Sequence, residues 1–272
     1  MIPILSADSY RGFSSNLALS GHTGAQPAFI GRLIWPGVEK ADDAVFKLYE
    51  TDTCGIANEV IGYLLNEFNG ITQPKSAAIV LLSPERLLGV NVKLDRFIDL
   101  SSGMVACWAT SFEQNTKPYR FVRRLSSFTE RQTKAFYKSA FCKRLSSVDH
   151  ITGNNDRHEG NFLYVDDLNY FAIDQGCVGG GLRWHTTWPD RGARNELLEL
   201  ARSALTSSEL ATWIGQALIA HGKSAESWIK NLCEVDLSLQ NLLSDDARDT
   251  IVEYMNDRAV GATFATSCGR LI

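Results

Sequence analysis

One stretch of the chain, Asp149–Gly176, limits the possible folds more than any other because short polar and apolar segments alternate within it. Residues 161–165 and 170–173 are rich in aromatic and β-branched side chains, which favour strands. The residues between them, 166–169, are two aspartates, a leucine and an asparagine, a composition typical of a tight turn. The pattern predicts a β-hairpin with polar loops at its open end.

Three side chains with oxygen atoms lie at the two ends of this predicted hairpin. Asp156 and Asn161 stand before and at the start of the first strand, and Asp174 directly follows the second. Asp and Asn side chains can serve a reaction site, but they also hydrogen-bond the backbone of ordinary turns. The Asp-x-Gly sequence after the second strand favours a site over a simple turn.

The order and spacing of these residues resemble the catalytic loop and the metal-binding turn of the HipA-like kinases and, more distantly, of the phosphoinositide kinases. In these families N-x-D-x-x-x-x-N replaces the H-R-D-x-x-x-x-N loop of protein kinases, and I-D-x-G replaces D-F-G. The matching segments here are Asn154–Asn161 and Ile173–Gly176. The resemblance covers about residues 20–185 and is nearest to compact HipA-like domains, which lack the long N-terminal region of full-length HipA toxin kinases.

The resemblance implies an enzyme that transfers a phosphoryl group from ATP to a serine or threonine hydroxyl of a protein. Asp156 would take the proton of that hydroxyl as catalytic base, and Asn161 and Asp174 would hold Mg²⁺. His158, inside the loop, is expected to order the loop as a hydrogen-bond donor rather than to act as a base, because Asp156 occupies the base position. The resemblance also implies an antitoxin or another regulatory protein as a partner.

A strand and a helix upstream supply two further catalytic candidates, Lys47 and Glu59. Residues 44–49 have strand character, and residues 55–68 place apolar side chains at helical spacing before an Asn-Gly stop. In the resembling kinases a strand lysine contacts the ATP phosphates and a helix glutamate pairs with it. We therefore expect a Lys47–Glu59 ion pair; the alternatives are a solvent-facing lysine and a glutamate that only stabilises the helix N-terminus.

A glycine-containing hairpin is the first of two regions expected to contact ATP. It joins strands predicted at 16–19 and 28–34 and contains Gly21, Thr23 and Gly24. Glycine lets backbone N–H groups approach a phosphate closely. The alternative is an ordinary hairpin, because neither a full glycine-rich motif nor a P-loop is present.

The second such region is the apolar strand predicted at 104–112. The resemblance implies that this strand leads into a hinge between two lobes. Backbone groups of Ala109, Ser111 and Phe112 are then expected to face the adenine base.

The remaining elements follow from periodicity and from capping residues. A buried strand is predicted at 77–82 and a short one around 89–94. A helix is expected from a Ser127–Glu130 capping box to about residue 145, with Phe136, Ala140 and Phe141 facing a core. Further helices are predicted near the C-terminus at 195–204, 207–221, 225–232 and 245–259. A loose tail is expected from residue 261.

Composition narrows the class of protein. The net charge is −4, from 27 basic and 31 acidic residues, and no basic run points to direct binding of nucleic acid or of an anionic membrane. The N-terminus lacks the basic region of a signal peptide, and no apolar run approaches the length of a membrane span. Six scattered cysteines without a C-x-x-C motif favour reduced thiols in a cytoplasmic protein.

The expected fold is α+β and two-lobed, like that of protein kinases. Residues 1–112 would form the N-lobe, a mixed or antiparallel sheet with one helix, and residues 113–272 would form a mainly helical C-lobe. ATP with Mg²⁺ is expected between the lobes. Two alternatives to a HipA-like protein kinase stay open: an enzyme of kinase fold that acts on a small molecule or lipid or transfers a nucleotide, and a catalytically silent binding protein.

Overall fold

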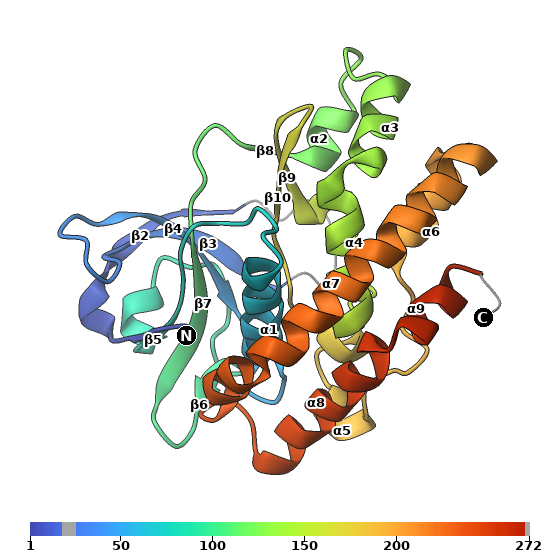
Figure 1. The fold of residues 1–272 in the computed structure, drawn as a ribbon. Helices are drawn as coiled ribbons and strands as arrows, with labels where there is room; N and C mark the ends of the chain where they lie inside the picture. The colour runs from blue at the N-terminus through green and yellow to red at the C-terminus, as the bar shows by residue number, and fades with distance from the viewer. Residues whose placement is uncertain (18–25, 270–272) are drawn as a thin grey trace. The chain divides into compact units, whose positions relative to one another are not determined.

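The computed structural model describes residues 1–17 and 26–269, which form a mixed α+β protein. A β-sheet occupies the N-terminal half and helices dominate after it, as the sequence predicts (Figure 1). The chain divides into two compact units: a sheet unit of residues 1–56 and 74–114, and a helical unit of residues 57–73 and those from 115 onward. The division thus groups residues 57–73 with the helices, whereas the sequence-based division kept them with the sheet.

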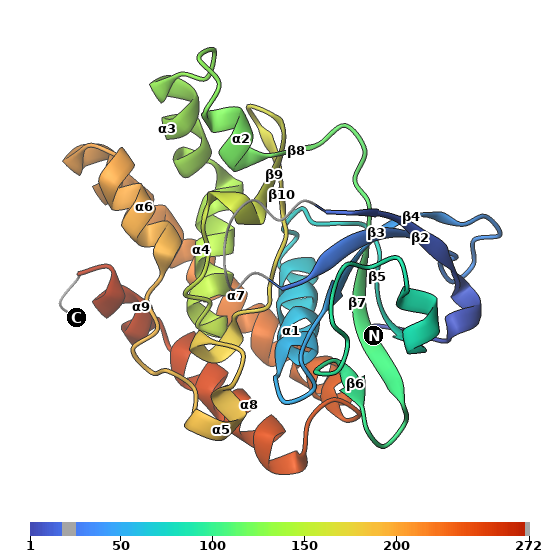
Figure 2. The ribbon, with the colours of Figure 1, turned by 180° about the vertical axis from the view of Figure 1, so that it is seen from behind.

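The sheet unit contains one seven-stranded sheet. Its strands are β1 (Ile4–Leu5), β2 (Tyr10–Asn16), β3 (Ala28–Leu33), β4 (Asp42–Leu48), β5 (Ala77–Leu82), β6 (Ile98–Asp99) and β7 (Met104–Ser111). Neighbouring strands follow the order β1–β5–β7–β4–β3–β2, and β6 pairs with β7. The β1–β5 pair is parallel and the other described pairs are antiparallel, with β7 between β5 and β4 (Figure 2).

The core of the sheet unit is built from apolar side chains. Side chains alternate between the faces of a strand, so Phe46 and its neighbours two positions away lie on the same buried face of β4. Phe46 stacks on Phe29 with ring centroids 4.9 Å apart and meets the edge of Tyr10 at 5.4 Å. Burial of the Phe29 and Phe46 rings stabilises the sheet without requiring hydrogen-bond partners.

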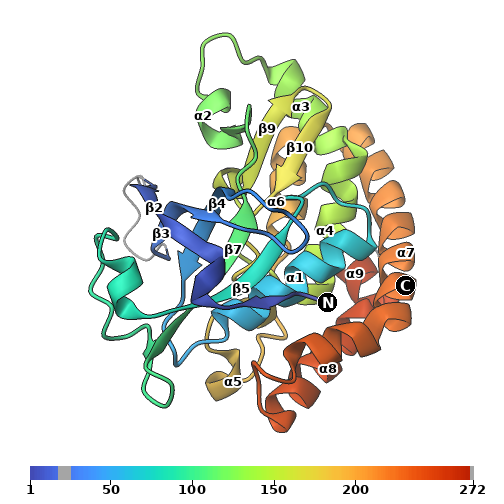
Figure 3. The same ribbon diagram turned by 90° about the vertical axis from the view of Figure 1, so that its left-hand side faces the viewer.

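The helical unit contains most of the helices and a second, smaller sheet. Its elements are α1 (Gly55–Phe68, which starts within the sheet unit), β8 (Lys117–Pro118), α2 (Tyr119–Arg123), α3 (Glu130–Lys138), α4 (Ala140–Thr152), β9 (Phe162–Asp166), β10 (Asn169–Ala172), α5 (Trp184–Thr187), α6 (Glu196–Ala204), α7 (Ser207–Leu239), α8 (Asp245–Ala259) and α9 (Gly261–Ser267). α4 packs against α7 and α8, and β9 and β10 run side by side (Figure 3).

The predicted hairpin is confirmed as the antiparallel pair β9–β10, in a sheet of order β10–β9–β8. Asp166 fixes its turn, because Oδ1 of this aspartate accepts hydrogen bonds from the N–H groups of Leu168 and Asn169. Aromatic rings attach the hairpin to the helices: Phe136 of α3 lies 4.9 Å from Tyr170 between ring centroids. The hairpin therefore rests on an aromatic cluster rather than on its turn alone.

Several predicted elements match the structure and others differ for local reasons. The ranges 55–68, 77–82 and 245–259 are confirmed as α1, β5 and α8. The helix predicted from Ser127 is instead two helices, since Thr129 and Gln132 form the capping box of α3 and Ser139 caps a new helix, α4. Of the three side chains expected to face a core there, Ala140 is exposed.

The other differences lie at chain segments without strong local signals. No strand forms around 89–94, and the strand expected at 16–19 ends at Asn16 within the described residues. The helices predicted at 207–221 and 225–232 are one helix, α7. The tail expected to be loose forms α9, which buries Phe264.

Two further findings concern the whole described chain. None of its helices combines the length and the apolar character that crossing a membrane requires. All six cysteines are free thiols, as their scattered positions predict.

Candidate functional site

The loop that carries Asp156 begins at the end of α4. Gly153 ends the helix with a φ of 66°, a left-handed conformation that glycine adopts readily. A Cβ atom there would lie 1.9 Å from the hydroxyl of Tyr254, so no larger residue fits. Asn154 then accepts a hydrogen bond from the N–H group of Asp156 at 3.1 Å. The side chain of Asp156 is exposed, as a residue that receives a proton from a substrate must be.

Asn161 closes the same loop. Its side-chain nitrogen donates to the carbonyl of Asp156 at 2.9 Å, and the residue is only 3% exposed. The carbonyl of Asn161 accepts from the N–H group of Ile173 at 3.0 Å, and Ile173 directly precedes Asp174. The structure therefore brings the predicted residues Asp156, Asn161 and Asp174 to the same end of the hairpin.

Arg157 connects the loop to the segment that follows β10. Its guanidinium group is fully buried and donates to both carboxylate oxygens of Asp149, at 2.9 and 3.0 Å. It also donates to the backbone carbonyls of Ile173 and Asp174, at 2.8 and 3.3 Å. One side chain thus holds the residue after Asp156 against the backbone of Asp174.

The Asp149–Arg157 pair is an ion pair without contact to solvent. Burial by itself would lower the pKa of the Arg157 guanidinium, but the charge and the hydrogen bonds of Asp149 outweigh burial and raise it. The arginine therefore carries its charge at neutral pH. Two charge-assisted hydrogen bonds at this geometry fix the direction of the guanidinium group.

Asp174 has a backbone conformation that few residues adopt. Its φ is 62°, in the left-handed region that Asp and Asn tolerate better than other non-glycine residues. Such strain costs about 1–2 kcal/mol and is found preferentially at functional sites. The bonds from Arg157 and from Ile173 hold the backbone on either side, so the carboxylate of Asp174 leaves the chain in one defined direction.

Helix α1 contacts this segment through two buried polar side chains. Glu59, 2% exposed, accepts a hydrogen bond from the N–H group of Gln175 at 3.0 Å. Asn58, fully buried, donates to the carbonyls of Gly176 and Gly181 and accepts from the ring nitrogen of Trp184 at 2.9 Å. The helix therefore positions the residues that follow Asp174.

The thiol of Cys177 is influenced by the charges of both Asp156 and Asp174. Its thiol donates to Oδ1 of Asn155 at 3.1 Å. Burial, together with the negative charges of Asp156 and Asp174, raises the pKa of this thiol to about 12. The thiol is therefore protonated at neutral pH, and its environment contains both carboxylates of the predicted site.

The donor set can be tested against the expected magnesium ion. Asn161 uses its amide nitrogen for the carbonyl of Asp156, which leaves the amide oxygen as the atom able to face a cation, and Asp174 supplies a carboxylate. Among the described residues, no group of three or more His, Cys, Asp or Glu is arranged to hold a metal. The set fits Mg²⁺, which takes most of its ligands from water and phosphate, and does not fit a structural zinc site.

The remaining candidates come from the N-terminal part of the chain. Lys47 lies on β4, half-buried, on the face opposite the apolar core. Glu59 belongs to the helical unit, and the Lys47–Glu59 ion pair stays a prediction. Gly21, Thr23 and Gly24, expected to cover the phosphates, lie outside the described residues.

The backbone groups expected to face adenine are engaged in the sheet. Ala109 is fully buried in β7 with β4 on one side and β5 on the other. The N–H group of Ser111 donates to the carbonyl of Ser76 at 2.9 Å, and that of Phe112 donates to the carbonyl of Asp43 at 3.1 Å. These two donors are therefore not available to a base in this structure, which counts against adenine contacts through them.

Sequence reasoning assigned no role to the residues that hold the site together: Asp149, Asn154, Arg157 and Asn58. Arg157 lies inside the recognised motif and Asp149 lies before it, and an Arg directly after the loop aspartate is the one signal that could have identified the pair. His158 orders the loop as expected, but as an acceptor rather than as the predicted donor: its ring nitrogen accepts from the N–H group of Gly160 at 3.0 Å.

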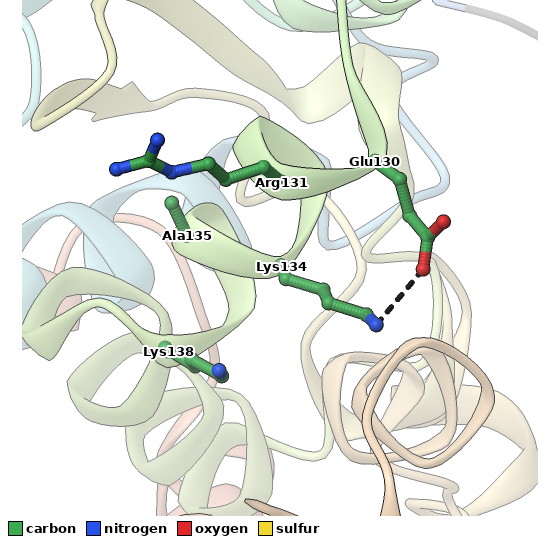
Figure 4. A pocket seen from close by; sticks show the side chains of 5 residues that line it. All are labelled: Glu130, Arg131, Lys134, Ala135 and Lys138. Carbon is green, nitrogen blue, oxygen red and sulfur yellow. Dashed lines mark ion pairs between the residues drawn. The ribbon is translucent and has the colours of Figure 1, made fainter.

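A surface pocket on α3 is separate from this site. It is lined by Glu130, Arg131, Lys134, Ala135 and Lys138, with an ion pair of 2.8 Å between Glu130 and Lys134 (Figure 4). None of the predicted site residues lines this pocket, so it is not the predicted nucleotide site.

Comparison with known proteins adds no family assignment. No family model matches the chain, and no curated protein matches it.

Proposed function

We propose that this protein is an ATP-dependent phosphotransferase that uses Mg²⁺, and that its acceptor is a serine or threonine hydroxyl of a protein. The fold we propose is the two-lobed fold of HipA-like and protein kinases. One observation carries the proposal: Asp156, Asn161 and Asp174 lie at the same end of the β9–β10 hairpin. A hydrogen bond from Asn161 to Asp156 and the side chain of Arg157 hold them there.

The division of roles follows from the chemistry of each side chain. Asp156 is exposed and acceptor-only when ionised, so it would orient an acceptor hydroxyl and take its proton. Asn161 and Asp174 would hold Mg²⁺, which when bound neutralises charge on the phosphate oxygens. Phosphoryl transfer asks little covalent chemistry of a protein, so positioning of these groups accounts for most of the catalysis.

The network around the site supports the same roles. Glu59 and Asn58 fix the segment Gln175–Gly176, and Arg157 fixes the backbone of Asp174. Catalytic groups need neighbours that restrict them to within a fraction of an ångström of the productive geometry. Lys47 would contribute positive charge toward the phosphates, as the resemblance implies.

The test is transfer of phosphate from γ-³²P-labelled ATP to protein, lipid and sugar acceptors, each with and without Mg²⁺. Asp156→Ala is expected to lower transfer by about 10²–10⁴-fold, the contribution of a general base, while ATP affinity measured by calorimetry changes little. Asp174→Asn is expected to abolish transfer and to weaken nucleotide binding in the presence of Mg²⁺ only.

Asp249→Asn is the matched control, because Asp249 is an exposed aspartate on α8 in the same unit. It should transfer phosphate at the wild-type rate. Undiminished turnover in Asp174→Asn would remove the metal assignment, and a wild-type protein that binds no ATP with Mg²⁺ would remove the proposed function. Transfer to lipid or sugar but not to protein would change the acceptor class and keep the reaction.

A further inference from the structure

One segment of the helical unit is strongly basic in an otherwise acidic chain. Residues 117–144 contain nine lysines and arginines and one acidic residue, Glu130. The remainder of the chain holds 18 basic and 30 acidic residues, so the charge is +8 in the segment and −12 outside it. A positively charged segment in a negatively charged protein attracts negatively charged binding partners and discriminates against positively charged ones.

Part of this positive charge is neutralised locally. Lys134 pairs with Glu130 at 2.8 Å, and Lys138 pairs with Glu209 at 2.5 Å. By contrast, Lys117, Arg124 and Arg131 are exposed and form no ion pair within the part of the chain that the structure describes. Figure 4 shows the side chain of Arg131 extending away from the Glu130–Lys134 pair.

The basic residues of β8 and α2 lie directly beside the loop that carries Asp156. β8 pairs with β9, with Lys117 opposite Tyr164, and β9 starts one residue after Asn161. Arg123 forms an ion pair with Glu159. The guanidinium of Arg120 lies 3.7 Å from the position of a Cβ atom at Gly160. We call Lys117, Arg120, Arg123, Arg124 and Arg131 the basic patch.

Apolar side chains are exposed within the same patch. Phe121 is 46% exposed and Leu125 is 52% exposed, on α2 and just after it. The guanidinium of Arg120 lies over the ring of Phe121, 5.2 Å from its centroid. A surface that mixes arginines with large apolar side chains is typical of protein–protein contacts.

We propose that the basic patch binds an acidic segment of the protein that supplies the acceptor hydroxyl. This inference rests on the proposed function and names its substrate class: a serine or threonine flanked by glutamate or aspartate and by an apolar side chain. Arg120 and Arg123 of the patch lie beside the loop of Asp156, so a peptide bound to the patch would bring its hydroxyl near the proposed base. The exposed Phe121 and Leu125 would receive the apolar side chain.

An acidic peptide fits this surface better than a nucleic acid does. The patch is short, and the chain outside residues 117–144 carries a charge of −12, which repels an extended polyanion. A peptide of a few acidic residues ends before it reaches that region. Binding of an oligonucleotide is therefore the competing outcome of the test.

The test uses three fluorescein-labelled synthetic peptides that contain one serine and one leucine and differ only in the flanking residues, which are Glu, Gln or Lys. Binding is followed by fluorescence anisotropy without ATP, and phosphoryl transfer by mass spectrometry with ATP and Mg²⁺. The Glu peptide should bind about tenfold more tightly than the Gln peptide, as expected for two or three exposed charge pairs, and the preference should shrink as salt is raised.

Charge reversal in the patch identifies the surface. Arg124→Glu/Arg131→Glu should reduce the ratio of Glu-peptide to Gln-peptide affinity, and the same ratio of kcat/KM, from about tenfold to about one. The control is Lys223→Glu/Lys230→Glu, the same change of charge at exposed positions of α7, which should keep the tenfold ratio. Thermal unfolding followed by circular dichroism verifies that both variants are folded.

The outcomes separate this inference from the proposed function. Transfer to the Gln and Glu peptides at equal rates would overturn the role of the basic patch and keep the kinase. A Glu preference in anisotropy without any transfer would keep the surface as a binding site for acidic protein and remove the proposed reaction. Tighter binding of a single-stranded oligonucleotide than of the Glu peptide, lost in the same double variant, would overturn the peptide as the occupant.

Discussion

The two units bury different kinds of side chain. The core of the sheet unit is apolar and is centred on stacked aromatic rings, among them Phe29 and Phe46. Among the described residues, every buried polar or charged side chain belongs to the helical unit. They are Asn58, Glu59, Asn66, Ser146, Ser147, Asp149, His150, Thr152, Asn154, Arg157, Asn161, Gln175, Asn195, His221, Ser224 and Arg258.

This difference shows that the hydrogen bonds and ion pairs of buried side chains are concentrated in the helical unit. A buried apolar side chain stabilises whatever surrounds it, whereas a buried polar group is costly unless a partner stands at the right distance and angle. Polar burial therefore fixes directions as well as contacts. In the helical unit much of it surrounds the segment from Asp149 to Gly176, which carries the proposed catalytic residues.

The largest expected effect comes from breaking the buried ion pair. Arg157→Met leaves the carboxylate of Asp149 buried without its partner, so the helical unit should lose about 3–5 kcal/mol of unfolding free energy. Hydrogen exchange measured by mass spectrometry reads this loss in the peptides of each unit separately. The comparison of the two units predicts that protection falls in the helical unit first.

Two variants make this prediction specific. Arg157→Met/Asp149→Leu removes both charges, and should be more stable than Arg157→Met alone because no unpaired charge remains buried. Arg202→Met removes a half-buried surface arginine that pairs with Glu199 and should cost no more than about 0.5 kcal/mol. If Arg157→Met lost no more unfolding free energy than Arg202→Met, the buried Asp149–Arg157 pair would contribute no more to stability than a surface pair does.

The same contrast decides how much of the molecule the sequence could predict. Helix α1, strand β5 and the hairpin follow from periodicity and turn residues inside each segment. α7 was predicted as two helices, but residues 222–224 between them are helical, and the chain continues as one helix from Ser207 to Leu239.

The polar network could not be predicted in the same way. Asn58 meets Trp184 across 126 positions of sequence, and no local pattern distinguishes it from a surface asparagine. The motif identified Asp156, Asn161 and Asp174, but it gave no sign that the φ of Asp174 is positive. The backbone around Asp174 is held by the hydrogen bond from Arg157 to its carbonyl and by that from the N–H group of Ile173 to Asn161. Residues whose role is to position others are thus visible only when their distant partners are known.

In the sheet unit, a large effect should arise from loss of packing alone. Phe46→Ala removes a fully buried ring that stacks on Phe29, and should cost about 3–5 kcal/mol. The cost should be the same at pH 7 and at pH 5, because the described residues of this unit contain no histidine. Val38→Ala, at a 42% exposed position, is the control and should change little. A pH-dependent cost would contradict a purely apolar core.

The helical unit, by contrast, should lose stability as the pH falls. Burial, with the charge of Arg258, lowers the pKa of His150 to about 2, and burial lowers the pKa of His221 to about 4. The unfolded chain takes up both protons near pH 6.5, whereas the folded unit does not. Each histidine should therefore cost about 1.4 kcal/mol per pH unit as the pH falls below about 6.5, until its folded pKa is reached.

Hydrogen exchange between pH 7 and pH 5, corrected for the intrinsic exchange rate, measures this slope in each unit. His221→Asn should roughly halve the slope of the helical unit, because one of the two sites no longer titrates. An equal slope in the sheet unit would break the comparison, since it would mean that the two units unfold together or that other groups dominate the titration.

The smallest expected effect sharpens the comparison most, because it separates a positioning role from a stabilising one. Glu59→Gln keeps the shape of the side chain and an oxygen that can accept from the N–H group of Gln175, but it removes the charge that strengthens this bond. The loss should be about 1 kcal/mol, or about fivefold in an equilibrium constant. Exchange of the Gln175 amide should rise by that factor while the remainder of the helical unit stays protected. If Gln175 positions Asp174, kcat/KM should fall by a similar factor with the same acceptor.

Glu67→Gln, at an exposed position of the same helix, is the control and should change neither the exchange of the Gln175 amide nor kcat/KM. A loss of protection throughout the helical unit would mean that Glu59 supports the fold as a whole, and an unchanged kcat/KM with faster exchange at Gln175 would show that the segment after Asp174 does not control the reaction.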